Sequence, residues 1–448
     1  MQDFTSGKIG RQIFAFALPM LIGQMFQQLY TFVDQIIVGN FIGKEALAAV
    51  GASFPIIFTL IAFVIGIASG GTIVISQFFG AKDFTKVKRA IDTLFIILAG
   101  ASVILTIVGL LFSEDIFRLL KLPEELMTPA NSYLKIYIAG LFLFFGFNGV
   151  AAILRGLGDS KTPLYFLILS TVLNIGLDLL FILVLEWGIE GAAYATLIAQ
   201  GVSFIVAVIY LNRTHPLIKF NIREFSFDRI IFKQSLRIGL PTGFQHTFVA
   251  LGMMALMGIV NTFGTDVVAA FTAAGRLDSL AILPAMVFAQ ALSTFVGQNM
   301  GAGNITRVKQ GMWRTLIMTS LVSAVMTAFV IIFKYPLMGM FTEDTEVIRI
   351  GGEYLTIVTS FYLIFTTMFI FSAVMRGAGD TLVPMFITLF ALWFIRIPAA
   401  VFFSKHMGEA GIWWSIPCGW TIGMILSVIY YKMGRWKNKV VVKPSVIA

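Results

Sequence analysis

An internal repeat is the strongest constraint on how this chain can fold. The motif QxxGA at residues 77–81 recurs at residues 298–302, and the motif RGxGD at 155–159 recurs at 376–380, so both pairs are 221 positions apart. Weaker matches at the same offset pair Tyr133 with Tyr354, and the stretch 40–49 with 261–270. One constant offset over separate segments indicates a duplicated architecture, whose two copies share a scaffold.

Composition places this duplicated scaffold in a membrane. Hydrophobic residues make up 58% of the chain and charged residues only 12%, whereas a soluble domain has roughly a quarter of its residues charged. A soluble enzyme is therefore excluded. Stretches long enough to cross a bilayer, about 20 apolar residues each, occur twelve times. They lie at residues 14–39, 46–78, 91–112, 130–154, 163–185, 188–211, 235–262, 267–298, 312–333, 350–375, 382–404 and 410–431.

The predicted fold is an all-α integral membrane protein of twelve transmembrane helices, six in each repeat. Because six is even, both halves enter the membrane from the same side, and we expect two lobes related by a pseudo-two-fold axis along the membrane normal. The predicted N-terminal lobe is 1–211, the connector 212–234, the C-terminal lobe 235–431 and the basic tail 432–448. The connector is unusually long for a loop, which fits either a tether between moving lobes or a passive linker.

The distribution of basic residues predicts the orientation of the chain. Of the 32 Lys and Arg residues, 23 fall on the side that carries both termini and the connector, and 7 on the other side. By the positive-inside rule the termini and the connector are cytoplasmic, in the plasma (inner) membrane. The net charge of +9 thus reflects topology, and no nucleic-acid partner is expected.

Charged residues inside the predicted helices are the first candidates for a functional site, since each costs several kcal/mol in a bilayer unless it is paired or hydrated. Asp34 shares one helix face with Gln27 and Tyr30, and Asn174 lies one turn before Asp178. Thr196 in the following helix adds a hydroxyl. The second repeat lacks these groups, so the scaffold is duplicated and this chemistry is not.

Two interpretations of the Asp34 and Asp178 pair remain open from these residues. The carboxylates can be structural, each hydrogen-bonded to a neighbouring helix. Alternatively they bind a coupling ion: a carboxylate pair takes up a proton, and together with Asn174 and Thr196 it offers the oxygen ligands that a hard cation such as sodium prefers. No other metal and no cofactor is expected.

The predicted C-terminal lobe has its own polar residues. Arg276 and Asp278 are two positions apart and do not share a helix face, so each is expected to find partners on other helices. A lone histidine in a helix is either hydrogen-bonded structure or a proton relay. The candidates for the C-lobe half of a cavity are Gln245, His246, Arg276, Asp278 and Arg396.

On these motifs the chain is similar, over nearly its whole length, to the multidrug and toxic compound extrusion (MATE) family. The resemblance rests on the QxxGA and RGxGD loops in both halves and on the NxxxD pattern of Asn174 and Asp178. It implies a coupling-ion site in the N-lobe and a helix that bends at Pro19, which the sequence alone also allows to be a static kink or a helix start. The implied coupling-ion residues are Asp34, Asn174, Asp178 and Thr196, and the implied polar network around them is Gln27, Tyr30, Tyr133, Tyr137 and Asn148. The chain departs from the branch with a C-lobe cation site, because helices 7 and 10 are expected to carry no carboxylate.

The function expected from this pattern is secondary active efflux. The chain would export amphipathic, cationic organic compounds or drugs in exchange for protons or sodium by alternating access, as a monomer in the lipid bilayer. ATP is not expected to supply the energy, because the sequence has no GxxxxGK[ST] motif. The alternative is a lipid or lipid-linked saccharide flippase of the same fold superfamily, and less favoured alternatives are an ion channel and a non-transporting receptor. The chain is not expected to be an enzyme.

Overall fold

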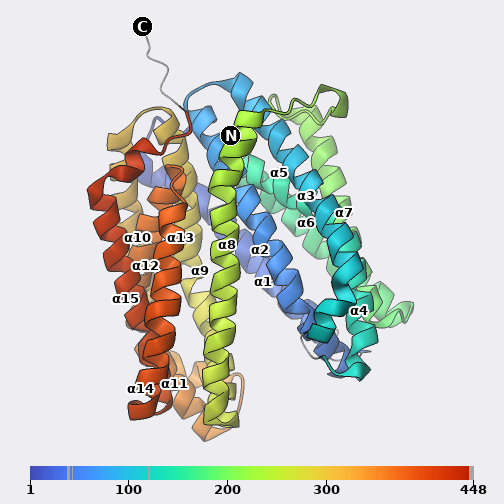
Figure 1. The fold of residues 1–448 in the computed structure, drawn as a ribbon, viewed down its shortest axis with the longest axis vertical. Helices are drawn as coiled ribbons and strands as arrows, with labels where there is room; N and C mark the ends of the chain where they lie inside the picture. Colours follow the sequence, from blue (N-terminus) through green and yellow to red (C-terminus); the bar gives the residue numbers. More distant parts are fainter. Residues whose placement is uncertain (38–40, 43, 120–121, 443–448) are drawn as a thin grey trace. The chain divides into compact units, whose positions relative to one another are not determined.

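The structure is a computed structural model that describes residues 1–37, 41–42, 44–119 and 122–442. Within this part of the chain every regular element is helical (Figure 1). Ten helices are long and apolar enough to cross a membrane, and two bent helix pairs bring the number to twelve if each pair counts as one span. The prediction of an all-α membrane protein is therefore confirmed.

The two bent pairs occupy matching places in the two repeats. α4 (Glu124–Ala139) and α5 (Leu141–Gly156) meet at 51°, and α11 (Thr345–Thr359) and α12 (Tyr362–Gly377) meet at 48°. Each pair covers one apolar stretch that the sequence predicts as a single helix. Gly140 at the first break and Ser360 at the second follow the last turn of the preceding helix. The fourth and tenth predicted spans are thus broken spans.

The first compact unit consists of Met1–Gln2 and Leu18–Gly243. It contains the second part of α1 (Ile9–Ile37) and the first part of α8 (Arg229–Val260), and the elements between them follow in chain order. These are α2 (Lys44–Gly80), α3 (Phe84–Leu119), α4, α5, α6 (Lys161–Asp178), the π-helical segment η2 (Leu179–Val184), α7 (Gly188–Thr214) and the short η3 (Ile222–Glu224). α6 and α7 pack along each other, and α2 packs on α5.

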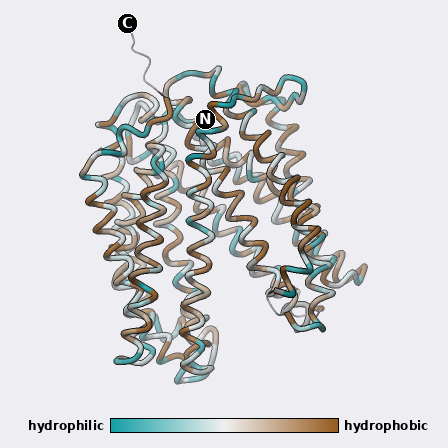
Figure 2. The backbone as a smooth tube through the Cα atoms, in the orientation of Figure 1, coloured by the Kyte–Doolittle hydropathy of each residue, from teal (hydrophilic) through white to brown (hydrophobic). Residues whose placement is uncertain are grey.

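The second compact unit consists of Asp3–Ala17 and the chain from Phe244 onward. Its core includes Trp413, Tyr362 and Leu355, all nearly inaccessible to solvent. Beyond α8 it contains η4 (Asn261–Phe263), α9 (Thr265–Gly301), α10 (Ile305–Gly339), α11, α12, α13 (Leu382–Leu389), the π-helical segment η5 (Phe390–Arg396), α14 (Ile397–Met407), α15 (Glu409–Met433) and η6 (Arg435–Asn438). Figure 2 shows hydrophobic residues along the long helices and hydrophilic residues gathered in the loops at their ends.

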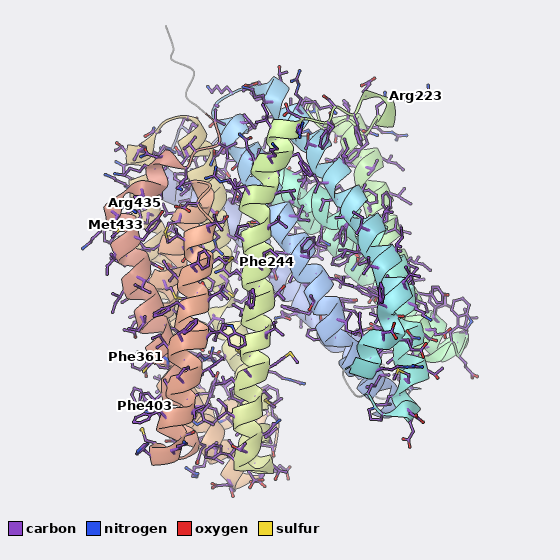
Figure 3. The ribbon with its side chains drawn as sticks, viewed as in Figure 1. Arg223, Phe244, Phe361, Phe403, Met433 and Arg435 are labelled. Atoms are coloured by element: carbon purple, nitrogen blue, oxygen red, sulfur yellow. The ribbon has the colours of Figure 1, made fainter. Side chains whose placement is uncertain are left out.

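The boundaries of the compact units differ from the predicted lobes in two places. The first eighteen residues do not all belong with the N-terminal half, because Asp3–Ala17 packs with the second unit. Phe4 N donates to Gln298 Oε1 at 2.9 Å, and Arg307 donates to the Phe4 carbonyl at 2.8 Å. The second division falls inside α8, before Phe244 (labelled in Figure 3), and not in the connector 212–234.

The repeated loops have a structural explanation. In both RGxGD motifs the second glycine adopts a positive φ, +77° at Gly158 and +95° at Gly379, which few other residues tolerate. Asp159 then caps α6, since its Oδ1 accepts from Thr162 N at 3.1 Å. Both copies of the motif therefore end a helix with this glycine, whereas the aspartates differ: Asp380 Oδ2 accepts from Tyr430 Oη at 2.6 Å.

The connector is ordered against α3 of the first unit. Phe220 packs on Phe95 with ring centroids 4.6 Å apart, and Ser226 N donates to Asp92 Oδ2 at 3.3 Å. At its start, burial and the nearby amino terminus lower the pKa of His215 to about 4, so its ring is neutral and accepts from Ile218 N at 3.1 Å. Arg223, labelled in Figure 3, lies in the short η3 of the same connector. The connector is thus a packed segment of the first unit.

Candidate functional site

The first unit brings Asp34, Asn174, Asp178 and Thr196 together, as the sequence predicts. The four residues come from three helices, α1, α6 and α7. The Asn174 amide is assigned in the orientation that gives both its nitrogen and its oxygen a hydrogen bond. Its Nδ2 then donates to Asp178 Oδ2 at 2.8 Å, and its Oδ1 accepts from Thr196 N at 3.2 Å. The Asp34 and Asp178 carboxyl groups lie close enough to interact directly. A hydrogen bond between two carboxyl groups requires a proton on one of them.

The carboxylate pair keeps unused binding capacity. Asp34 Oδ1 and Asp178 Oδ1 are both buried, and neither has a hydrogen-bond partner among the described residues. A buried acceptor without a partner is costly, and two adjacent buried carboxylates cannot both remain charged without a compensating cation. The pair therefore keeps two buried oxygens that no described residue satisfies. The described residues contain no group of three or more His, Cys, Asp or Glu that could hold a metal ion.

Tyr30 connects this pair to the next helix. It lies one turn before Asp34 on α1, and its Oη shares a hydrogen bond of 3.1 Å with Thr196 Oγ1. Tyr133 on α4 is buried, with 7% of its surface exposed. A chain of polar contacts thus runs from α1 through α7 to α6. Any rearrangement of the carboxyl groups changes hydrogen bonds on three helices at once.

Two members of the predicted polar network lie outside this chain of contacts. The Gln27 side chain is exposed, although it shares the predicted helix face. Asn148 Nδ2 donates at 2.9 Å to the carbonyl of Phe144, one turn back on its own helix. Sequence spacing identifies the face of a helix, but it does not show how far along that face the neighbouring helices reach.

A small cavity lies next to Thr196. Its volume is about 10 Å³, close to that of one water molecule by the same measure. The predicted Tyr137 lines it, and so does Gln200, which the sequence analysis missed. Gln200 stands one turn after Thr196 on α7, and this i, i+4 spacing is the signal that identifies it. The lining residues are Tyr137, Gly140, Phe144, Thr196, Leu197 and Gln200.

Pro19 lies inside α1, ten residues after the helix begins. This position excludes the reading of Pro19 as a helix start. The division between the two compact units falls between Ala17 and Leu18, immediately before this proline. A proline removes one backbone hydrogen bond and clashes with the preceding turn. The part of α1 that carries Tyr30 and Asp34 therefore follows a weakened point in the helix.

The second unit holds Asp278 in a different environment. Tyr362 Oη donates to Asp278 Oδ1 at 2.7 Å, and Tyr354 Oη lies 3.5 Å from Oδ2. The two tyrosines belong to α12 and α11, so the partners of this aspartate do lie on other helices. Neither tyrosine is among the residues predicted for the site, although Tyr354 is the repeat counterpart of Tyr133. Phenol donors satisfy this carboxylate, unlike the pair in the first unit.

Of the other predicted C-lobe residues, Arg396 lies close enough to Asp278 for their opposite charges to interact. Gln245 donates to Thr388 Oγ1 at 2.6 Å, and Arg276 is exposed. Arg396, at the end of η5, has a buried Nε without a partner among the described residues, and its Nη1 lies 3.7 Å from Met253 Sδ. His246 is partly buried on α8.

One expectation about this unit is wrong. The predicted tenth helix, 350–375, does contain a carboxylate, Glu353, in its first turn. It lies 3.6 Å from Arg349, one turn earlier on α11, and its side chain is 38% exposed. Glu353 is an exposed ion-pair partner near a helix end, and the rest of this span carries no further carboxylate.

Comparison with known proteins agrees with the duplicated scaffold. A family model described as MatE matches residues 19–180 and again residues 241–402. The two matches begin at Pro19 and Pro241. The probable multidrug resistance protein YpnP of Bacillus subtilis (strain 168) is 34% identical over 438 residues, which cover 97% of this chain and 97% of that protein.

Solved structures resemble the whole chain. The crystal structure of MATE in the straight conformation matches with a TM-score of 0.91 and 27% sequence identity, over 97% of this chain and 98% of that one. The crystal structure of MATE in the bent conformation matches with a TM-score of 0.90 at the same identity, over 97% and 98% of the two chains.

Proposed function

The chain belongs to the MATE family of membrane transporters, and we propose that it is a secondary active antiporter that exports amphipathic, cationic organic compounds in exchange for protons. The observation that carries this proposal is the Asp34 and Asp178 pair, with one partnerless buried oxygen on each carboxyl group. The similarity to a probable multidrug resistance protein supports the substrate class. A bound proton neutralises one of the two carboxylate charges, and exchange of that proton couples the site to the pH gradient.

The mechanism follows from the helices that carry the two carboxyl groups. A proton shared between Asp34 and Asp178 joins α1 to α6. When the proton leaves, two like charges face each other, and at about 4 Å and an effective dielectric constant near 20 their repulsion is roughly 4 kcal/mol. This exceeds the net value of one hydrogen bond, about 1 kcal/mol. Deprotonation therefore drives the second part of α1 away from α6, with Pro19 as the point where α1 can bend.

Sodium is the competing coupling ion, and the same residues define how it would bind. Sodium needs several oxygen ligands at once, which here are the two carboxylates, the Asn174 amide oxygen and the Thr196 hydroxyl. In the present arrangement the Asn174 amide is engaged by Asp178 and Thr196 N, and the Thr196 hydroxyl by Tyr30. A proton leaves these bonds as they are, whereas sodium needs the same two oxygens as additional ligands, and this favours the proton.

The test uses purified protein in proteoliposomes with the two gradients imposed separately. We expect a pH gradient alone to drive export of a fluorescent organic cation, and a sodium gradient at clamped pH to drive none. Asn174→Ala and Thr196→Val should then alter the rate without creating a sodium requirement. Export that runs on sodium at clamped pH and stops without sodium would replace the proton in this proposal.

We also propose that the chain termini and the connector 212–234 are cytoplasmic in the plasma (inner) membrane, because 23 of 32 basic residues lie on that side. Arg223 is exposed in the connector, and Cys418 is the one native cysteine. Arg223→Cys in a Cys418→Ser background should react with a membrane-impermeant maleimide only after the cells are permeabilised. Labelling in intact cells would reverse the orientation.

A further inference from the structure

Exposed side chains in the first turns of α10 line an open hollow on the surface of the second unit, with a volume of about 570 Å³. Neither Lys309 nor Arg314, the two cations that line it, has a hydrogen bond or ion pair with another described residue, and no carboxylate lines it. The stem of Arg314 lies 4.0 Å from where a Cβ on Gly10 of α1 would stand. The lining residues are Thr306, Lys309, Gln310, Trp313, Arg314 and Ile317.

An exposed apolar stripe continues from this hollow along the same helix. Its members recur every four residues and then after three, the spacing of one helix face, and each is between 47% and 69% exposed. The stripe covers about 29 Å at 1.5 Å per residue, close to the thickness of the hydrocarbon core. The stripe residues are Trp313, Ile317, Leu321, Val325, Phe329 and Ile332. This face of α10 therefore fits lipid acyl chains.

The repeat shows what covers the equivalent surface in the first unit. The counterparts of Lys309, Trp313 and Arg314 at the repeat offset are Lys88, Asp92 and Thr93 on α3. The chain's own connector covers them: Lys88 donates to the Lys219 carbonyl, Ser226 N to Asp92, and Asp228 N to Thr93. On α10 the same positions carry exposed side chains, and the buried carboxylate is replaced by a tryptophan.

We propose that the hollow binds the headgroup of an anionic phospholipid, with its phosphate between Lys309 and Arg314 and an acyl chain along the stripe. Tryptophan prefers the boundary between headgroups and hydrocarbon, which fits the position of Trp313 next to Arg314 and between Lys309 and Ile317. Basic residues beside a spanning helix attract anionic lipid. A zwitterionic choline headgroup would place a third positive charge beside those of Lys309 and Arg314. A phosphatidylcholine therefore binds less tightly than an anionic phospholipid.

The test measures lipid affinity with the full-length protein in detergent, by native mass spectrometry with phosphatidylglycerol and phosphatidylcholine. Lys309→Gln/Arg314→Gln should weaken phosphatidylglycerol binding about 10- to 30-fold, since each basic residue near the surface contributes about a factor of five, and should leave phosphatidylcholine binding unchanged. The matched control is Lys233→Gln/Arg237→Gln, which removes two exposed cations from the start of α8 and should weaken binding less than the α10 pair does, because neither cation lines the hollow.

A second readout does not depend on removing charge. Phosphatidylglycerol brominated on its acyl chains should quench tryptophan fluorescence of the native protein, and Trp313→Phe should remove that quenching component. Inorganic phosphate at millimolar concentration should not displace the lipid, because it has no acyl chain. The proposal is overturned if the α10 and α8 double variants lose affinity equally, if phosphate competes, or if lipid binds only to a dimer. None of these measurements depends on which ion drives transport.

Discussion

Asp178→Asn is expected to lower gradient-driven export about 100-fold, near the upper end of typical coupling free energies. The amide preserves the shape of the carboxyl group, and its NH2 can donate to Asp34 while its oxygen accepts from Asn174. The variant thus imitates a permanently protonated pair. It should fold and bind substrate, but it cannot release a proton, so the step that separates α1 from α6 no longer occurs. Asp34→Asn should behave in the same way, for the same reason.

The measurement is the initial rate of export in proteoliposomes under a fixed pH gradient, with substrate binding and thermal unfolding measured on the same preparations. Asp278→Asn is the matched control, since Tyr362 already donates to Asp278 Oδ1 and an amide oxygen accepts the same bond; its rate should fall less than about threefold. If both first-unit variants export at the wild-type rate, the carboxylate pair has a structural role and the coupling site lies elsewhere.

The sequence predicts this site because a charge in a bilayer is costly wherever the helix lies. Asp34 and Asp178 can be identified without knowing how the helices pack, and the i, i+4 spacing adds Asn174 and Tyr30. Asp278 can be identified for the same reason. The twelve apolar stretches and the duplicated loops likewise depend on local composition, and the structure contains all of them. The second glycine of each RGxGD motif has a positive φ.

Contacts between helices are harder to predict from the sequence of a membrane protein than the helices themselves. In a soluble helix the apolar face marks the core, but in a membrane both the lipid and the core favour apolar residues. The exposed stripe on α10 and the buried face of α9 therefore look alike in sequence. The phenol partners of Asp278, the exposure of Gln27 and the packing of the connector on α3 all depend on which face meets a neighbour.

The glycine contact between α2 and α8 is an exception, because its signal is local. Gly66 and Gly70 on α2, and Gly239 and Gly243 on α8, are each spaced as GxxxG, the pattern that allows two helix backbones to approach. A Cβ added to Gly66 would lie 2.4 Å from Gly243 N and 2.8 Å from the Gly239 carbonyl oxygen. These neighbours are backbone atoms, so no side-chain rotation can relieve the clash.

Gly66→Ala is therefore expected to destabilise the protein by about 3 kcal/mol, the upper end of the usual cost of overpacking, and to lower its Tm by roughly 3 °C, because the unfolding entropy of so long a chain is large. The measurement is thermal unfolding of the purified protein in detergent. Gly51→Ala is the control on the same helix, since nothing lies within 4 Å of its added Cβ, and it should leave the Tm within about 1 °C of wild type. Equal Tm values for the two variants would show that α2 and α8 separate freely. A loss confined to Gly66→Ala would show that this contact fixes the first part of α8, and the connector before it, to the first unit.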